Sequence, residues 1–179
     1  MLVHPIDNGY NIQQVTEYVE RISKYKFDEI NNSLWFYFDF GGRNIIMEII
    51  DKYKTNQEII LYSIKCLFNL YCIEKNFFNK VPRFNNYLQI VSLILDNHND
   101  RIIVEEILGF LYLIINIFDI NNLINILKIL DKKYKTKPIQ SEREKFILNK
   151  ILEYIWNYMP IQKDYIENIK FIANKQNIK

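Results

Sequence analysis

Residues that interrupt helices are scarce in this sequence. The 179 residues include only 4 glycines and 4 prolines. An all-β fold needs many tight turns, which are rich in these residues, so the scarcity argues against that class. The hydrophobic fraction of 49% and the charged fraction of 25% are ordinary for a soluble globular protein. We therefore expect an all-α fold, with residues 1–179 forming a single helical domain.

Cysteine and histidine are also scarce, with two of each. Cys66 and Cys72 are six residues apart, no CxxC pair is present, and His4 and His98 are remote from both in sequence. This spacing argues against a disulfide framework and against a zinc site. We expect buried, reduced thiols, no metal and no cofactor.

Long apolar segments of the kind that enter membranes are missing. The first residues lack the basic and apolar regions of a signal peptide. The most apolar stretch, 102–117, contains Glu105 and Glu106 and is too short to cross a bilayer. The expected location is the cytoplasm, with the nucleus as the alternative, and no membrane partner is expected.

No arrangement typical of catalysis stands out. Glu105 and Glu106 are adjacent and would point in different directions on a helix, so they do not form a facing acid–base pair. Gly41 and Gly42 lack the further glycines and the Lys-Ser/Thr of a phosphate-binding loop. We expect a protein that is not an enzyme.

Apolar residues recur at helical spacing along most of the chain. This periodicity predicts helices over 12–25, 27–38, 44–53, 57–71, 76–81, 86–95, 101–118, 121–133, 141–158 and 162–175. Capping-box spacing is expected at Thr55 with Glu58 and at Ser141 with Glu144. The remaining segments are an irregular lead-in at 1–10, a basic loop at 132–140 that contains Pro138, and a frayed tail at 176–179.

An asparagine between apolar residues closes three of the long helical segments. Asn69, Asn116 and Asn157 occupy these positions, at intervals of 47 and 41 residues. Such intervals are typical of helical-repeat proteins. When the chain is aligned on the three asparagines, each unit reads as a shorter helix, a polar turn and a longer helix. The alternative is a generic helical bundle in which the spacing is accidental.

The first of these units resembles an armadillo repeat. The residues that carry the resemblance are the Gly41-Gly42 entry, the short apolar helix 44–50, the polar turn at 56–58 and the long helix that ends near Asn69-Leu70. Weaker copies at 86–116 and 122–157 extend it over residues 28–160. The resemblance implies a right-handed armadillo/HEAT-like solenoid of about three to four repeats.

In that family, the third helix of each repeat lines a groove. In its nuclear-import adaptor branch, an asparagine of that helix binds the backbone of an extended peptide, and Asn69, Asn116 and Asn157 match this asparagine. The family's tryptophan one turn earlier is replaced by Lys65, Tyr112 and Glu153, which argues against recognition of basic import signals. We nevertheless predict that the groove binds a partner through the positions grouped here: Asn69, Asn116, Asn157, Lys65, Tyr112 and Trp156. The alternatives are that the asparagines satisfy helix ends and that Trp156 belongs to the core.

Charge is unevenly distributed along the chain. Residues 1–131 contain 12 basic and 16 acidic residues (net −4), whereas residues 132–179 contain 11 and 5 (net +6). A basic patch at Lys132, Lys133, Lys135 and Lys137 could attract RNA or the ribosome, or it could be an ordinary solvated helix face.

These observations predict a protein-interaction module, acting as an adaptor or as a subunit or regulator of a larger intracellular assembly. Its partner would be a peptide segment or a folded protein domain. Two alternatives are an armadillo-type nucleotide exchange factor for Hsp70 chaperones, which are compact solenoids of similar size, and a ribosome- or RNA-associated factor that uses the basic end.

Overall fold

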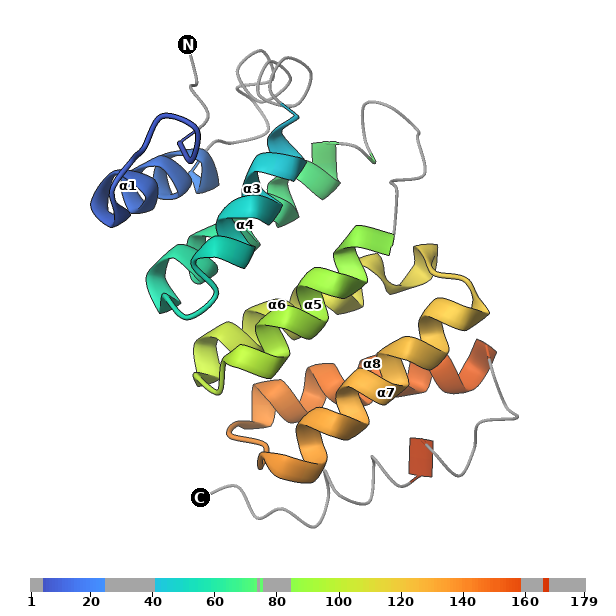
Figure 1. Cartoon of the computed structure of the whole chain (residues 1–179). Helices are drawn as coiled ribbons and strands as arrows, with labels where there is room; N and C mark the ends of the chain where they lie inside the picture. Colours follow the sequence, from blue (N-terminus) through green and yellow to red (C-terminus); the bar gives the residue numbers. More distant parts are fainter. Residues whose placement is uncertain (1–4, 25–40, 74, 76–84, 159–165, 168–179) are drawn as a thin grey trace. The chain divides into compact units, whose positions relative to one another are not determined.

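The computed structural model describes residues 5–24, 41–73, 75, 85–158 and 166–167, and every regular element among them is a helix. The all-α prediction is therefore confirmed for the part of the chain that is described (Figure 1). No helix in these ranges is both long enough and apolar enough to cross a membrane. The predicted helices 27–38 and 76–81, nearly all of 162–175 and the frayed tail lie outside the described residues.

The chain divides into two compact units, Met1–Arg83 and Phe84–Lys179. The single repeat domain expected over 1–179 stays a prediction, as do the solenoid and its handedness. Unit 1 contains α1 (Ile12–Ser23), α3 (Gly42–Lys52) and α4 (Gln57–Ile73). Unit 2 contains α5 (Asn85–Asn97), α6 (Arg101–Ile114), the 3-10 turn η2 (Ile115–Ile117), α7 (Ile120–Thr136) and α8 (Glu142–Tyr158).

In unit 1, α4 is the central helix, because it packs against both α1 and α3. The interface with α1 includes two hydrogen bonds to α1 carbonyls. The Cys66 thiol donates to the Val19 carbonyl at 3.3 Å, and the Asn69 amide donates to the Ser23 carbonyl at 3.1 Å. Both contacts advance along the two helices together, so α1 and α4 run in the same direction, with partners 47 and 46 residues apart.

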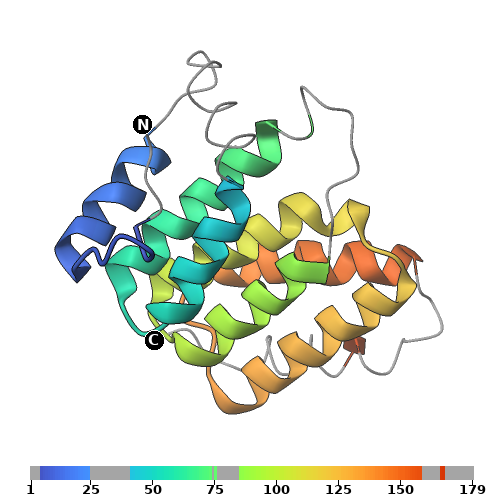
Figure 2. The same cartoon turned by 45° about the horizontal axis from the view of Figure 1, so that its top comes forward.

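In unit 2, two helical hairpins stack on each other. Helix α5 packs on α6 within its hairpin, while α5 packs on α7 and α6 packs on α8 between the hairpins (Figure 2). Where the helices of one hairpin face those of the other, the polar contacts join residues at nearly constant separation, whereas contacts to the turn residues His98 and Asn99 join residues 34 to 41 apart. Glu105 and Ser141 are 36 residues apart, Glu106 and Arg143 are 37 apart, and Leu95 and Lys133 are 38 apart. The facing helices of unit 2 therefore pair at a spacing of 36 to 38 residues.

Three local predictions about helix ends are corrected by the structure. The cap of α4 is Asn56 rather than Thr55, because the Asn56 side chain accepts the Ile59 amide at 3.0 Å. Helix α6 ends at Ile114 and continues only as the 3-10 turn. In the third predicted pair the helices are equal in length, since α7 and α8 both contain 17 residues.

The predicted basic loop at 132–140 is also wrong at its beginning, because α7 continues to Thr136. Residues 132–136 contain no helix breaker, and Tyr134 is buried in the core of unit 2. An ion pair between Lys135 and Asp131, at 2.6 Å, further supports this turn. The helix stops where Pro138 forces the preceding Lys137 into an extended conformation, with φ −131° and ψ 130°.

Candidate functional site

The long helices of unit 2 present a shared exposed surface, which we call the α6–α8 face. On each helix the exposed and half-buried residues recur every three or four positions, so they lie on one side, opposite the buried stripe. The α6–α8 face comprises Ile102, Glu106, Gly109, Tyr112 and Asn116 from α6 and η2, and Arg143, Phe146, Lys150, Tyr154 and Tyr158 from α8.

Large apolar side chains are concentrated on the α6–α8 face. The exposed fractions are 51% for Ile102, 47% for Tyr112, 62% for Phe146 and 66% for Tyr158. These are four of the seven large hydrophobic residues that are exposed in the described part of the chain. Single exposed apolar residues are normal, but a group on one face is typical of an interaction surface.

The charged side chains of the face form ion pairs, either with each other or with the neighbouring Glu153. A guanidinium nitrogen of Arg143 lies 3.3 Å from a carboxylate oxygen of Glu106, and the Lys150 ammonium lies 2.9 Å from Glu153. The hydrogen bond with Glu153 raises the pKa of Lys150. Because positive and negative groups neutralise each other locally, apolar contact rather than net charge would dominate recognition here.

Tyr154 and Tyr158 form a stacked pair near the end of α8. Their ring centroids are 4.8 Å apart, and their planes are inclined by 22°. Burial, reinforced by the hydrogen bond and charge of Tyr158, raises the pKa of Tyr154 to about 12. The Tyr154 hydroxyl therefore stays protonated near neutral pH, and the pair offers apolar ring surface together with neutral polar groups.

Gly109 lies in the middle of the face, inside α6. A Cβ atom built at this position would meet nothing within 4 Å, so packing inside the protein does not require glycine. Glycine inside a helix costs roughly 0.5–1 kcal/mol relative to alanine. The missing side chain leaves the α6 backbone open to close approach from outside.

The three predicted groove asparagines have different environments. Asn69 lies within α4 rather than at its end, and its amide holds the Ser23 carbonyl of α1. That contact matches the alternative interpretation, in which the asparagine satisfies a helix end. Asn116 and Asn157 are exposed in unit 2. However, Asn157 lies 41 residues after Asn116, about one helical turn beyond the 36–38 spacing that aligns α6 with α8.

The other predicted partner-binding residues are divided between the units. Tyr112 belongs to the α6–α8 face, and Trp156 is half-buried on α8. Lys65 is exposed on α4 of unit 1, with its ammonium 5.7 Å from the centroid of the Tyr62 ring. The structure thus brings together Tyr112, Asn116, Trp156 and Asn157 in one unit, and Asn69 and Lys65 in the other.

The predicted basic patch is largely neutralised. Lys132 pairs with Asp96 at 2.9 Å, and Lys135 pairs with Asp131. Lys133 is buried, and its ammonium donates to the carbonyls of Leu95 and His98 and to the Asn99 side chain. Desolvation lowers the pKa of Lys133. Among the described residues of this patch, Lys137 is the one exposed lysine for which no ion pair is found.

A buried polar cluster lies where α7 meets the start of α8. The Glu144 carboxylate accepts hydrogen bonds from the Tyr134 hydroxyl and the Gln140 amide, each at 2.8 Å. Ser141 caps α8, since its hydroxyl accepts the Glu144 amide at 3.0 Å, so half of the predicted capping box is present. Burial raises the pKa of Glu144 above its usual 4.5. These groups satisfy one another, and the cluster therefore stabilises the hairpin.

Chemistry at the cysteines is restricted by burial. Burial raises the pKa of the Cys66 thiol well above its usual value, and it also raises the pKa of Cys72. Both cysteines are free, and their raised pKa values disfavour the reactive thiolate. Within the described ranges, no group of three or more His, Cys, Asp or Glu side chains is placed to hold a metal ion.

Of the ten residues of the α6–α8 face, the sequence predicted Tyr112 and Asn116 and missed the other eight, among them Phe146, Arg143 and Gly109. They could have been found in the sequence, because they recur at helical spacing on the side of α6 and α8 opposite the apolar residues. Comparisons with protein-family models, curated proteins and solved structures found no match to this chain.

Proposed function

We propose that this protein is a non-enzymatic protein-interaction module of armadillo/HEAT-like type, acting as an adaptor or subunit of a larger assembly. It would bind a peptide segment of a partner protein on the α6–α8 face. The observation that carries this proposal is the concentration of exposed apolar residues on that face around Gly109, a glycine that internal packing does not require.

The chemistry of the face indicates the kind of peptide. Arg143 and Lys150 are already paired with glutamates, so a strongly charged peptide would find few free counter-charges. Phe146, Tyr112 and the stacked Tyr154 and Tyr158 offer ring surfaces for apolar side chains. Gly109 leaves space for the peptide backbone. We therefore infer an extended, weakly charged segment with apolar anchors.

The spacing of unit 2 supports a repeat architecture for this function. Residues 36 to 38 apart pair with each other between its two hairpins, as expected when equivalent helices stack. Stacking of this kind places the second helices of successive hairpins side by side, which creates a continuous surface. A solenoid would therefore be expected to form a binding surface from equivalent helices such as α6 and α8.

The test begins with peptides selected from a random-sequence display library on the full chain. A selected peptide is synthesised, and its affinity is measured for the wild type and for Phe146→Ala. The matched control is Ile120→Ala, which removes an apolar side chain that is 58% exposed on α7, outside the face. We expect Phe146→Ala to weaken binding about tenfold or more, as for an interface anchor, with little change for Ile120→Ala.

Three results would overturn the proposal. The first is a failure to select any peptide that binds the folded chain. The second is equal affinity for the wild type and Phe146→Ala. The third is dimerisation through this face, measured by sedimentation equilibrium and abolished by Phe146→Ala, because a second copy would then be its occupant.

A further inference from the structure

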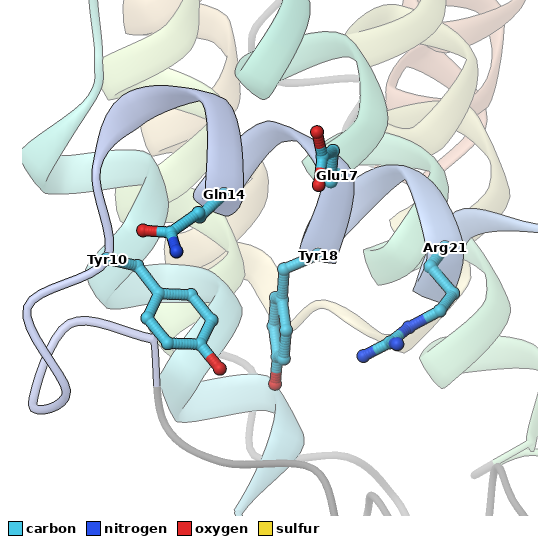
Figure 3. A pocket seen from close by; sticks show the side chains of 5 residues that line it. All are labelled: Tyr10, Gln14, Glu17, Tyr18 and Arg21. Carbon is cyan, nitrogen blue, oxygen red and sulfur yellow. The ribbon is translucent and has the colours of Figure 1, made fainter.

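A cavity of about 390 Å³ lies beside α1 in unit 1. Its described lining consists of Tyr10, Gln14, Glu17, Tyr18 and Arg21 (Figure 3). Four of these residues recur on one side of α1, and Tyr10 comes from the preceding turn. This size falls within the range of roughly 300–1,000 Å³ that is usual for small-molecule sites.

The turn before α1 places Tyr10 at the cavity. The Tyr10 amide donates to the Pro5 carbonyl at 3.0 Å, which closes the turn. Gly9 adopts a φ of 66°, a left-handed conformation that other residues rarely adopt. The chain then enters α1 through a complete capping box between Asn11 and Gln14. The hydrogen-bonded turn and the capping box thus fix the position of the Tyr10 backbone beside the cavity.

The side chains at the cavity are arranged with most donors on one side. In the view of Figure 3, the Tyr10 hydroxyl, the Tyr18 hydroxyl and the Arg21 guanidinium extend to the same side of α1, while the Glu17 carboxylate lies on the other. Glu17 accepts a hydrogen bond from Gln13 at 3.1 Å. Phenol hydroxyls both donate and accept, and a guanidinium only donates.

The amide of Gln14 adds a further donor. Its carbonyl oxygen accepts the Asn11 backbone amide at 3.0 Å, which fixes the side chain and leaves the NH₂ group available. Lys24, the C-cap residue that follows α1, pairs with Glu20 at 2.6 Å. No acidic partner is found for the Arg21 guanidinium within the described part of unit 1.

We propose that this cavity binds a small anionic group, a carboxylate or a phosphate. Arg21 supplies the positive charge, and the Tyr10 hydroxyl together with the Gln14 NH₂ group donates hydrogen bonds. The two tyrosine rings provide apolar walls for whatever the anion is attached to. The site belongs to unit 1 and does not depend on the α6–α8 face.

The test uses the full chain and four probes: inorganic phosphate, phenyl phosphate, acetate and benzoate. Binding is followed by NMR through the Nε–H signal of Arg21 and the ring signals of Tyr10 and Tyr18. The phosphate and carboxylate pairs distinguish the two sources of the anion, and the aromatic member of each pair tests the apolar walls. Arg21→Gln removes the charge, and Lys24→Gln removes a neighbouring charge that does not line the cavity.

We expect saturable shifts with at least one anion class, and Arg21→Gln should weaken that binding about ten- to a hundredfold, the usual effect of losing a charge-assisted hydrogen bond. Lys24→Gln should change it by less than about threefold, since Lys24 is exposed and already paired. The thermal unfolding midpoint of each variant establishes that it is folded. Absence of saturable binding by all four probes, or equal weakening in the two variants, would overturn the proposal.

Discussion

The ammonium group of Lys133 holds the end of α5 in place from inside unit 2. Only 7% of this residue is exposed, and its three hydrogen bonds end on the Leu95 carbonyl, the His98 carbonyl and the Asn99 side chain. The last turn of a helix leaves carbonyls without intrahelical donors, so these contacts satisfy groups that would otherwise be unpaired. From the sequence, Lys133 was indistinguishable from the exposed lysines around it.

Replacing Lys133 by Met should therefore lower the free energy of unfolding by about 2–3 kcal/mol, because buried acceptors lose their donor. The control is Lys132→Met, which removes only an exposed ion pair with Asp96 and should cost less than about 1 kcal/mol. Urea unfolding of the two variants measures both values. Equal destabilisation would show that the Lys133 hydrogen bonds contribute little.

Glu144 should make the stability of unit 2 depend on pH, with a contribution that falls as the pH rises. Burial raises its pKa above 4.5, despite opposing hydrogen bonds from Gln140 and Tyr134 and the charge of Lys133. The folded state therefore retains this proton at pH values where the unfolded state has lost it. The contribution of Glu144 to stability is complete below pH 4.5 and is lost as the pH rises through the folded pKa.

The variant Glu144→Gln removes this titration. We expect the stability of the wild type relative to Glu144→Gln to fall as the pH rises from below 4.5 toward neutrality. Urea unfolding of both proteins across that range gives the difference directly, and the other carboxylates cancel from it. A difference independent of pH, or one that rises, would contradict the assignment.

Asn69 and Asn116 look equivalent in sequence but should behave differently. The Asn69 amide bonds the Ser23 carbonyl at 3.1 Å, whereas Asn116 is exposed. Asn69→Ala should cost about 0.5–1.5 kcal/mol of unfolding free energy, and Asn116→Ala should stay within about 0.5 kcal/mol of the wild type. Thermal or urea unfolding of the two variants decides this. Equal costs would mean that the contact with α1 does not stabilise unit 1.

At the scale of whole helices, the sequence was most informative where apolar periodicity was strong. The predicted segments 57–71, 86–95 and 141–158 match α4, α5 and α8 within two residues at each end. The helix ends that the sequence predicted wrongly are ones where neighbouring residues could each start or end the helix. Thr55 and Asn56 can both cap a helix, and the structure uses Asn56. Likewise, the basic composition of 132–136 indicated a loop, although burial of Tyr134 keeps it helical.

Gly109 offers a test in which stability and binding should change in opposite directions. Gly109→Ala should stabilise α6 by about 0.5–1 kcal/mol, because the new Cβ meets no other atom within 4 Å and the unfolded chain loses freedom. The same methyl group should weaken the peptide selected on the α6–α8 face. Unfolding in urea and a binding titration provide the two measurements. Increased stability with unchanged binding would remove Gly109 from the proposed site.

At the scale of the whole molecule, the interval between the recurring asparagines differs from the sequence separation of the residues that contact each other between stacked helices. Asn116 and Asn157 are 41 residues apart, whereas the polar contacts between α6 and the start of α8 join residues 36 to 38 apart. Asparagine is abundant throughout this chain, so its positions alone could not fix a register. The α1 cavity was not predictable either, because its lining combines one side of α1 with Tyr10 of the preceding turn.

The distribution of charge in the folded molecule bears on whether it binds RNA. Residues 132–179 carry a net charge of +6 in sequence, but the folded structure pairs Lys132 with Asp96 and Lys135 with Asp131, and buries Lys133. At the basic patch itself, Lys137 is the one described lysine that is exposed and for which no ion pair is found, so the patch has little uncompensated positive charge to release counterions from a phosphate backbone. We expect affinity for a labelled single-stranded RNA to be no better than the roughly micromolar to 0.1 mM range of non-specific binding at physiological salt.

The triple variant Lys132→Gln, Lys135→Gln and Lys137→Gln should leave this weak RNA affinity nearly unchanged, since two of the three charges are already neutralised by carboxylates. Fluorescence anisotropy over a series of salt concentrations measures both the affinity and its salt dependence. Peptide binding on the α6–α8 face should respond little to the same salt series, because apolar contacts are not screened. Tight RNA binding that falls steeply with salt and disappears in the triple variant would instead favour the RNA-associated alternative.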